Sequence, residues 1–210
     1  DAIARGGLGT LFQGILDRKP VTDPHLMFMG IGDAACDQAP LQVSQFEADN
    51  RIVDQLTKLW LEKGGGGNSH ESYDFPWYFA GRHTAHDAMA KRGRRGYLFT
   101  VGDEETPSVL TRGQLKKTLG TDVQADVPSK MSLTEAQRLY DVYHVVIEQG
   151  DHCRSHDHRV KASWREMLGQ KVIHLADYQL LDETVVRALQ VAEGADHSPA
   201  AKGWGAGAQH

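Results

Sequence analysis

The sequence predicts an α/β fold, a three-layer sandwich in which a mostly parallel sheet lies between helices. Two observations carry this prediction. Several short segments, among them residues 97–101, are apolar or β-preferring throughout, as strands are when helices cover both faces of a parallel sheet. Longer segments with apolar residues at helical spacing alternate with them. We therefore expect one domain over residues 1–193, followed by a Gly/Ala-rich flexible tail over 194–210.

The first third of the chain predicts two helices and two strands. An apolar stripe predicts a helix over residues 2–18, which Pro20 ends. The apolar run 25–33, ending Gly-Asp, predicts a second buried strand. Residues 41–46 alternate apolar with polar side chains, as an edge strand with one wet face does, and a helix is expected over 48–63.

The middle of the chain predicts a loop, a long helix and the key strand. Four consecutive glycines open the loop 64–72, where the backbone can pass close to a ligand. The next helix is expected over 74–92, with Pro76 tolerated in its first turn. A buried strand over 97–103 then ends at a glycine and three carboxylates.

The last third predicts three helices and two buried strands after a short helix over 111–119 and a loop over 120–131. Ser132 and Glu135 have the spacing of a capping box, which predicts a helix from Ser132 to residue 140. The remaining elements expected are a strand over 144–148, a helix over 159–169, a strand over 171–175 and a helix over 180–192.

The composition limits the class of protein. Hydrophobic residues make up 40% of the 210 residues, the mean hydropathy is −0.47, and no apolar run is long enough to cross a membrane. The net charge of −5 argues against nucleic acid as the main partner. The two cysteines, Cys36 and Cys153, form no disulfide framework, so we expect a cytoplasmic protein. Because the chain begins with Asp1, we expect it to be processed or part of a longer protein.

Acidic side chains follow the carboxyl ends of the predicted strands. Asp103 and Glu104 follow one strand, Asp33 follows another, and Asn68, Ser69 and Glu71 lie in the Gly-rich loop. In open α/β sheets, ligands bind beyond the carboxyl ends of the strands. Oxygen ligands of this kind suit Mg²⁺, Mn²⁺ or Ca²⁺ rather than zinc. The other interpretation is a solvated acidic turn.

The element order, with a Gly-rich turn before a helix and then a buried strand ending Thr-Val-Gly-Asp, resembles a von Willebrand factor type A domain of the bacterial intracellular type, over residues 1–193. The resemblance implies a metal-ion-dependent adhesion site built from three loops. Asp103 matches the aspartate of the third loop. Asn68 or Ser69 stands where the second loop usually has threonine, and Glu71 is a further helper.

The first of these loops, Asp-x-Ser-x-Ser, occurs nowhere in the sequence. Residues 1–4 resemble the segment that directly follows it. Either the first strand, which is central in this family, lies outside this sequence, or the loop is supplied otherwise. A sheet without its central strand would have two unpaired edges.

Other chemistries have weaker support. The segment 151–158 is rich in zinc-ligand residue types, but spacing in a loop does not show that the side chains converge. His83 and His86 could share a helix face, yet HExxH is absent. Cys36 stands alone without a nucleophile motif, and no phosphate-binding Gly-rich motif accompanies the strand end at Asp103.

We expect a protein-binding module rather than an enzyme, acting as a scaffold or adaptor subunit of a larger assembly. The resemblance implies a bound Mg²⁺ (or Mn²⁺ or Ca²⁺) whose coordination an acidic side chain of a partner protein completes. Two alternatives remain open. One is a metal-dependent hydrolase that uses Asp33, Asp103 and Glu104 with a histidine as base. The other is a structural subunit with a degenerate, metal-free site.

Overall fold

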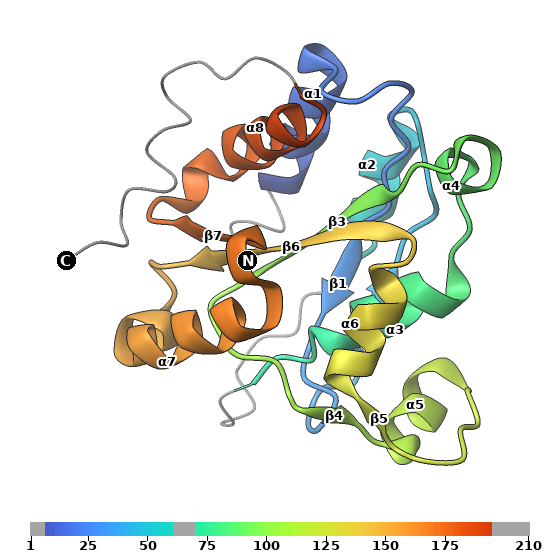
Figure 1. The fold of residues 1–210 in the computed structure, drawn as a ribbon, viewed down its shortest axis with the longest axis vertical. Helices are drawn as coiled ribbons and strands as arrows, with labels where there is room; N and C mark the ends of the chain where they lie inside the picture. The colour runs from blue at the N-terminus through green and yellow to red at the C-terminus, as the bar shows by residue number, and fades with distance from the viewer. Residues whose placement is uncertain (1–6, 61–69, 195–210) are drawn as a thin grey trace.

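A three-stranded parallel sheet in the order β3–β6–β7 lies at the centre of the molecule (Figure 1). Its strands are β3 (Gly96–Gly102), β6 (Tyr140–Ile147) and β7 (Val172–Leu175). The computed structural model describes residues 7–60 and 70–194. Helices lie between consecutive strands of this sheet, as parallel connections require. The prediction of an α/β fold with a parallel sheet is confirmed.

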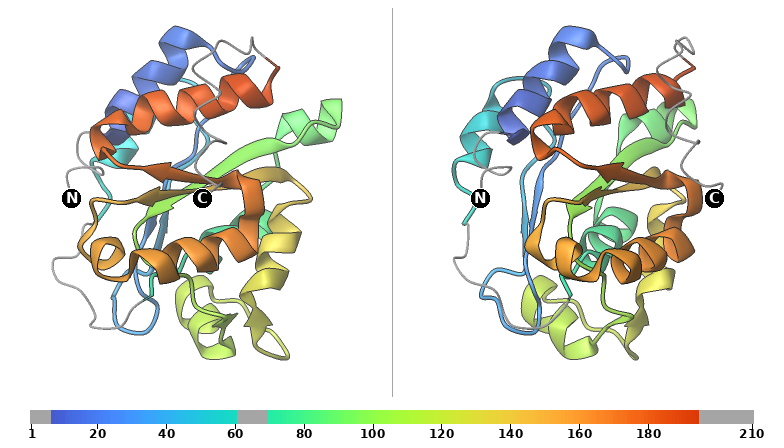
Figure 2. Two further views of the ribbon diagram at one scale, coloured as in Figure 1. Left: turned by 60° about the vertical axis from the view of Figure 1, so that its left-hand side comes forward. Right: turned by 90° about the vertical axis from the view of Figure 1, so that its left-hand side faces the viewer.

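Helices cover both faces of this sheet, which makes three layers (Figure 2). Val145 and Ile147 of β6 pack on one face against two helices, α1 (Leu8–Arg18) and α8 (Leu181–Ala192). Val142 and Val146, which point to the other face, pack against three helices: α3 (Asp74–His83), α6 (Ser129–Ala136) and α7 (Asp151–Leu168). Because side chains alternate between the two faces of β6, they contribute to two separate hydrophobic cores.

The expected long strand over 25–33 is wrong. Only β1 (Met29–Ile31) forms there, and it pairs with β2 (Leu41–Val43) in a separate antiparallel sheet. The connection between the two strands, residues 32–40, is too short for a parallel crossover, which needs a dozen or more residues. β2 pairs with no other strand of the described residues, in keeping with the predicted edge strand.

Among residues 7–60 and 70–194, β3 and β1 each have one edge without a partner strand, as do the outer strands β7 and β2. β3 pairs only with β6, and β1 pairs only with β2. The two sheets still share their cores: Met29 and Ile31 pack in the same cluster as Leu98, and Phe28 packs with Tyr97 on the other face. β1 is therefore aligned with the central sheet without a hydrogen-bonded ladder to it.

The helix expected over 74–92 is two helices, α3 and α4 (Asp87–Arg92). Thr84 is extended between them, and its hydroxyl bonds the carbonyl of Ala80 and the hydroxyl of Tyr140. His86 then caps α4 through its ring. The helix expected over 48–63 is shorter, since α2 spans Arg51–Leu56.

A small lobe follows the loop after β3. It contains β4 (Val109–Leu110), α5 (Arg112–Leu119) and β5 (Val127–Pro128), and the β5 strand lies where a loop was expected. A capping box forms on α5, from Thr111 and Gln114. The one predicted at Ser132 is wrong, because α6 begins three residues earlier and buries Ser132 inside the helix.

α7 begins at Asp151, eight residues before the expected start, so the His-rich segment is helical and not a loop. The backbone departs from helical geometry at His156, which marks a kink. Two 3₁₀ turns follow, Gly169–Lys171 and Tyr178–Leu180. No helix in the described parts of the chain combines the length and the apolar character needed to cross a membrane.

Candidate functional site

Asp103 is held at the carboxyl end of β3 by the N-terminus of α7. Its Oδ2 accepts hydrogen bonds from the backbone N–H groups of His152, at 3.1 Å, and Cys153, at 3.4 Å. Gly150 makes this approach possible, because a Cβ on it would lie 2.1 Å from the same oxygen. The favourable end of the helix dipole therefore fixes one oxygen of Asp103. Its Oδ1 accepts no hydrogen bond from the described residues.

Glu105, two residues on, is buried and neutralised. Its carboxylate bonds the guanidinium of Arg159, and its Oε2 lies 3.0 Å from Nε2 of His152. Burial opposes ionisation of Glu105, but the hydrogen bonds from Arg159 and His152 outweigh it and lower its pKa. Glu105 is thus a structural anchor that ties the loop after β3 to α7.

Glu104 faces a different environment. Its backbone carbonyl accepts a hydrogen bond of 2.9 Å from the indole of Trp164, which fixes the loop. Burial, followed by the nearby charges of Asp103, Glu105 and Asp33, raises the pKa of its side chain, although His152 partly offsets this. Its carboxylate makes no hydrogen bond within the described residues.

The segment before α3 lies beside this loop. His70 forms an isolated parallel bridge with Glu105, and the N–H of Glu71 donates to the carbonyl of Glu105 at 3.1 Å. Ser72 joins the same segment to the turn after β1, because its Oγ accepts from the N–H of Ala34 at 2.9 Å. Three chain segments distant in sequence therefore meet at one end of the sheets.

Asp33 is buried in the turn after β1 and is engaged in that turn. Its Oδ1 accepts from the N–H of Ala35 at 2.8 Å, and its Oδ2 accepts from the thiol of Cys36 at 3.0 Å. Asp37 in turn accepts from the N–H of Asp33 at 2.7 Å. The hydrogen bond to Asp33 raises the pKa of Cys36 to about 12, which favours the protonated thiol at neutral pH.

The pKa of Glu71 is raised in part by the negative charges around it. Burial raises its pKa to about 8, and the charges of Glu104, Asp37, Asp33 and Asp103 add to the effect. Its Oε2 is buried without a hydrogen-bond partner. We call these five carboxyl groups, from three chain segments, the acidic cluster: Asp33, Asp37, Glu71, Asp103 and Glu104.

The sequence had named four of these five residues, Asp33, Glu71, Asp103 and Glu104, and the structure brings them to the same end of the sheets. The other two predicted residues, Asn68 and Ser69, lie outside the described residues. Within the ranges 7–60 and 70–194, no three His, Cys, Asp or Glu side chains are grouped so as to hold a metal ion.

Sequence reasoning missed Asp37 and Arg159. Arg159 lies 54 residues from Glu105, whose charge it neutralises. A pattern of a few consecutive residues cannot predict an ion pair between such distant positions. Asp37 had a local signal, since Asp at i and i+4 around a tight turn can bond the turn's own backbone.

The histidines do not form the zinc sites that were considered. The rings of His152 and His156 stack on each other with centroids 4.5 Å apart, and His152 is engaged with Glu105. His83 stacks on Phe79, whereas His86 caps the next helix, so the break at Thr84 separates this pair.

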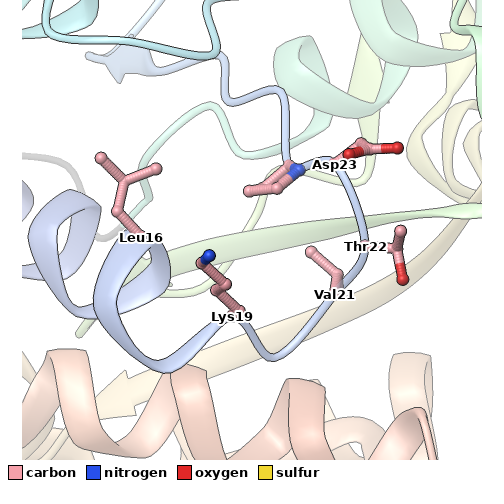
Figure 3. A pocket seen from close by; sticks show the side chains of 6 residues that line it. Leu16, Lys19, Val21, Thr22 and Asp23 are labelled. Atoms are coloured by element: carbon pink, nitrogen blue, oxygen red, sulfur yellow. The ribbon is translucent and has the colours of Figure 1, made fainter.

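A separate hollow is formed by residues that precede β1 in the chain (Figure 3), whereas Asp33 and Asp37 of the acidic cluster follow that strand. Its volume is about 320 Å³, and it is lined by Leu16, Lys19, Val21, Thr22, Asp23 and Pro24. Lys19 and Asp23 both have left-handed backbones, with φ of 43° and 49°. The carboxylate of Asp23 points away from Lys19 in Figure 3, so the charged groups do not converge on a ligand.

Comparisons of the chain with protein-family models, with curated proteins and with solved structures find no match. The resemblance to von Willebrand factor type A domains therefore depends on the residues and element order given above, and it stays a prediction.

Proposed function

We propose that this chain is a protein-binding module or scaffold subunit that binds a divalent cation, Mg²⁺ or else Mn²⁺ or Ca²⁺, at the acidic cluster. The observation that carries the proposal is the meeting of three chain segments, each with carboxyl groups, at one end of the sheets. The pKa of Glu71 agrees with this arrangement, because burial and then four other carboxylates raise it to about 8. A site that concentrates negative charge to this degree favours a cation, because a cation removes the repulsion among its ligands.

The donor set fits a hard cation. Asp103 Oδ1, Glu104 and Glu71 offer carboxylate oxygens that make no hydrogen bond within the described residues, and oxygen ligands are those that Mg²⁺ and Ca²⁺ prefer. Asp33 fits less well as a direct ligand, since both of its oxygens accept hydrogen bonds in its own turn. It contributes charge instead.

Each residue then has a defined part. Asp103 is positioned by α7 and supplies one oxygen. The side chains of Glu71 and Glu104, which are not grouped with it in the described structure, would move to supply the others. Asn68 and Ser69 precede Glu71 in the sequence, and the resemblance to type A domains assigns them to the same shell. A cation with an open coordination position would accept a carboxylate from a partner protein. The partner is accordingly a protein with an exposed Asp or Glu.

Isothermal titration calorimetry tests the proposal, with Mg²⁺, Mn²⁺ and Ca²⁺ added to protein freed of metal by EDTA. We expect binding by wild type and by the exposed-site control Glu166→Gln, whose carboxylate pairs with Lys130 away from the cluster. We expect none by Asp103→Asn or Glu104→Gln. Binding that is equal in all four proteins would refute the site.

The two alternatives give different results in the same preparations. A metal-dependent hydrolase would turn over a phosphoester or peptide substrate and lose this activity in Asp103→Ala. A structural subunit with a metal-free site would show no divalent affinity and would bury the acidic cluster in a constant interface. Binding of a partner that survives EDTA unchanged would favour the latter.

A further inference from the structure

Asp74 is a buried acid outside the acidic cluster. It is the first residue of α3 and is fully buried, and its Oδ2 lies 2.7 Å from the hydroxyl of Ser129 at the start of α6. Its Oδ1 has no hydrogen-bond partner in the part of the chain that the structure describes. The same Ser129 hydroxyl lies 2.7 Å from the carbonyl of Pro107. Asp74 therefore belongs to a junction of α3, α6 and the loop that leaves the acidic cluster.

The hydroxyl proton of Ser129 bears on the protonation state of Asp74. A hydroxyl has one proton, so Ser129 cannot donate to Asp74 and to Pro107 at the same time. If Asp74 is ionised, Ser129 donates to only one of these two acceptors, and the backbone N–H groups of Asp74 and Phe75 are the remaining donors to the carboxylate. If Asp74 is protonated, it donates to Ser129 and Ser129 donates to Pro107, so that both short contacts are satisfied.

The close packing of α3 against α6 leaves no room for a water molecule to donate a hydrogen bond to Asp74. α3 and α6 run side by side in the same direction, with Asp74 at the level of Ser129 and Gly81 at the level of Ala136. A Cβ on Gly81 would lie 2.9 Å from the backbone nitrogen of Ala136, so the helix backbones touch. An ionised Asp74 at this interface would be poorly solvated.

Within residues 7–60 and 70–194, no Lys or Arg side chain pairs with Asp74. On α6, Lys130 is exposed and pairs with Glu166, and Glu135 pairs with Arg82 two turns along α3. In the loop after β3, Glu105 is neutralised by Arg159. The neighbouring strands contribute no titratable group, since β1 is Met-Gly-Ile and β4 is Val-Leu.

We propose that Asp74 is a proton-dependent lock: as a neutral acid it closes the chain of hydrogen bonds to Ser129 and Pro107, and on losing its proton it releases the loop beyond the acidic cluster. Burial raises the pKa of Asp74 to about 6, although the hydrogen bond from Ser129 lowers it in part. The lock is therefore strongest below about pH 4 and weakens as pH rises towards 6. It does not depend on cation binding.

Hydrogen exchange measured by mass spectrometry on the full chain tests the lock, with rates corrected for their intrinsic pH dependence. In wild type, protection of the peptide covering residues 104–110 should fall by up to about tenfold per pH unit as pH rises from the ordinary pKa of 3.8 to about 6, and it should level off above that. Asp74→Asn keeps a neutral donor and should show the same protection at pH 5 and pH 7.5. The matched control Asp87→Asn changes the first residue of α4, which is exposed, and should follow wild type.

Two further measurements keep the proposal refutable if Asp74→Asn fails to fold. The infrared spectrum of wild type should contain a protonated carboxyl band at pH 5 that disappears by pH 7.5. Ser129→Ala removes the hydroxyl that links Asp74 to Pro107, so protection of residues 104–110 should be as low at pH 5 as at pH 7.5. Absence of the band at pH 5, or identical exchange profiles in wild type and Asp74→Asn, would overturn the lock.

Discussion

Replacing Glu71 by glutamine should stabilise the protein while weakening its affinity for divalent cations. Glu71 is ionised in the unfolded chain at neutral pH, but in the folded protein burial and four neighbouring carboxylates raise its pKa to about 8. A raised pKa means that stability is lost as pH rises from the unfolded pKa towards the folded one. Glutamine has nearly the same shape and no charge, so it removes this loss.

The size of the effect follows from the shift. Raising the pKa from 4.5 to about 8 costs about 3 kcal/mol at pH 7 without screening. Because the Glu71 carboxyl is only partly buried, solvent screening reduces the expected gain to about 1–2 kcal/mol. The difference between variant and wild type should be small at pH 4.5 and largest near pH 8.

Urea unfolding in EDTA at several pH values measures this difference. Glu105→Gln is the matched control, because Glu105 is neutralised by Arg159 and the same substitution there should destabilise the protein. Saturating Mg²⁺ or Ca²⁺, at about 100 times the dissociation constant, should add about 2.7 kcal/mol to wild type and less to Glu71→Gln. A variant that is less stable than wild type at pH 8 would refute the electrostatic reasoning.

Three further substitutions test the architecture of the site, each by urea unfolding. Gly150→Ala places a Cβ 2.1 Å from Asp103 Oδ2 and 2.3 Å from its Cβ, so the whole side chain must move; we expect a loss of about 1–3 kcal/mol and weaker cation binding by calorimetry. Gly81→Ala pushes α3 from α6 and should cost a similar amount, about 1–3 kcal/mol, with cation affinity unchanged. Arg159→Ala leaves Glu105 buried without its main partner and should cost about 1–3 kcal/mol at pH 7. Because the pKa of Glu105 is lowered in wild type, this stability is present above its unfolded pKa and is lost as pH falls; the variant should therefore be less sensitive to acid, and an unchanged acid sensitivity would contradict the assignment.

The sequence by itself determined the class of fold and the acidic character of the candidate site. Residues 97–101 carry unbroken apolar or β-preferring side chains, and β3 is indeed covered by helices on both faces. Glycine and carboxylates directly after this strand placed Asp103 and Glu104 correctly at its carboxyl end. These signals are local, because strand period and turn chemistry are properties of a few consecutive residues.

Local signals failed where contacts distant in sequence decided the outcome. The segment 74–92 has helical residues throughout, yet Tyr140 binds Thr84 and contributes to the break between α3 and α4. Ser132 and Glu135 have the spacing of a capping box. However, α6 packs against α3 and begins before Ser132, at Ser129.

Tertiary structure alone decided the charges of the acids. Asp74, Glu71 and Glu105 have similar carboxyl groups, and Glu71 and Glu105 also have polar neighbours in the sequence. Their pKa values diverge because Asp74 is buried without a cation, Glu71 is surrounded by carboxylates, and Glu105 is bound by Arg159. Burial and charge at a side chain depend on which distant segments pack around it, and a sequence pattern of a few residues does not contain that information.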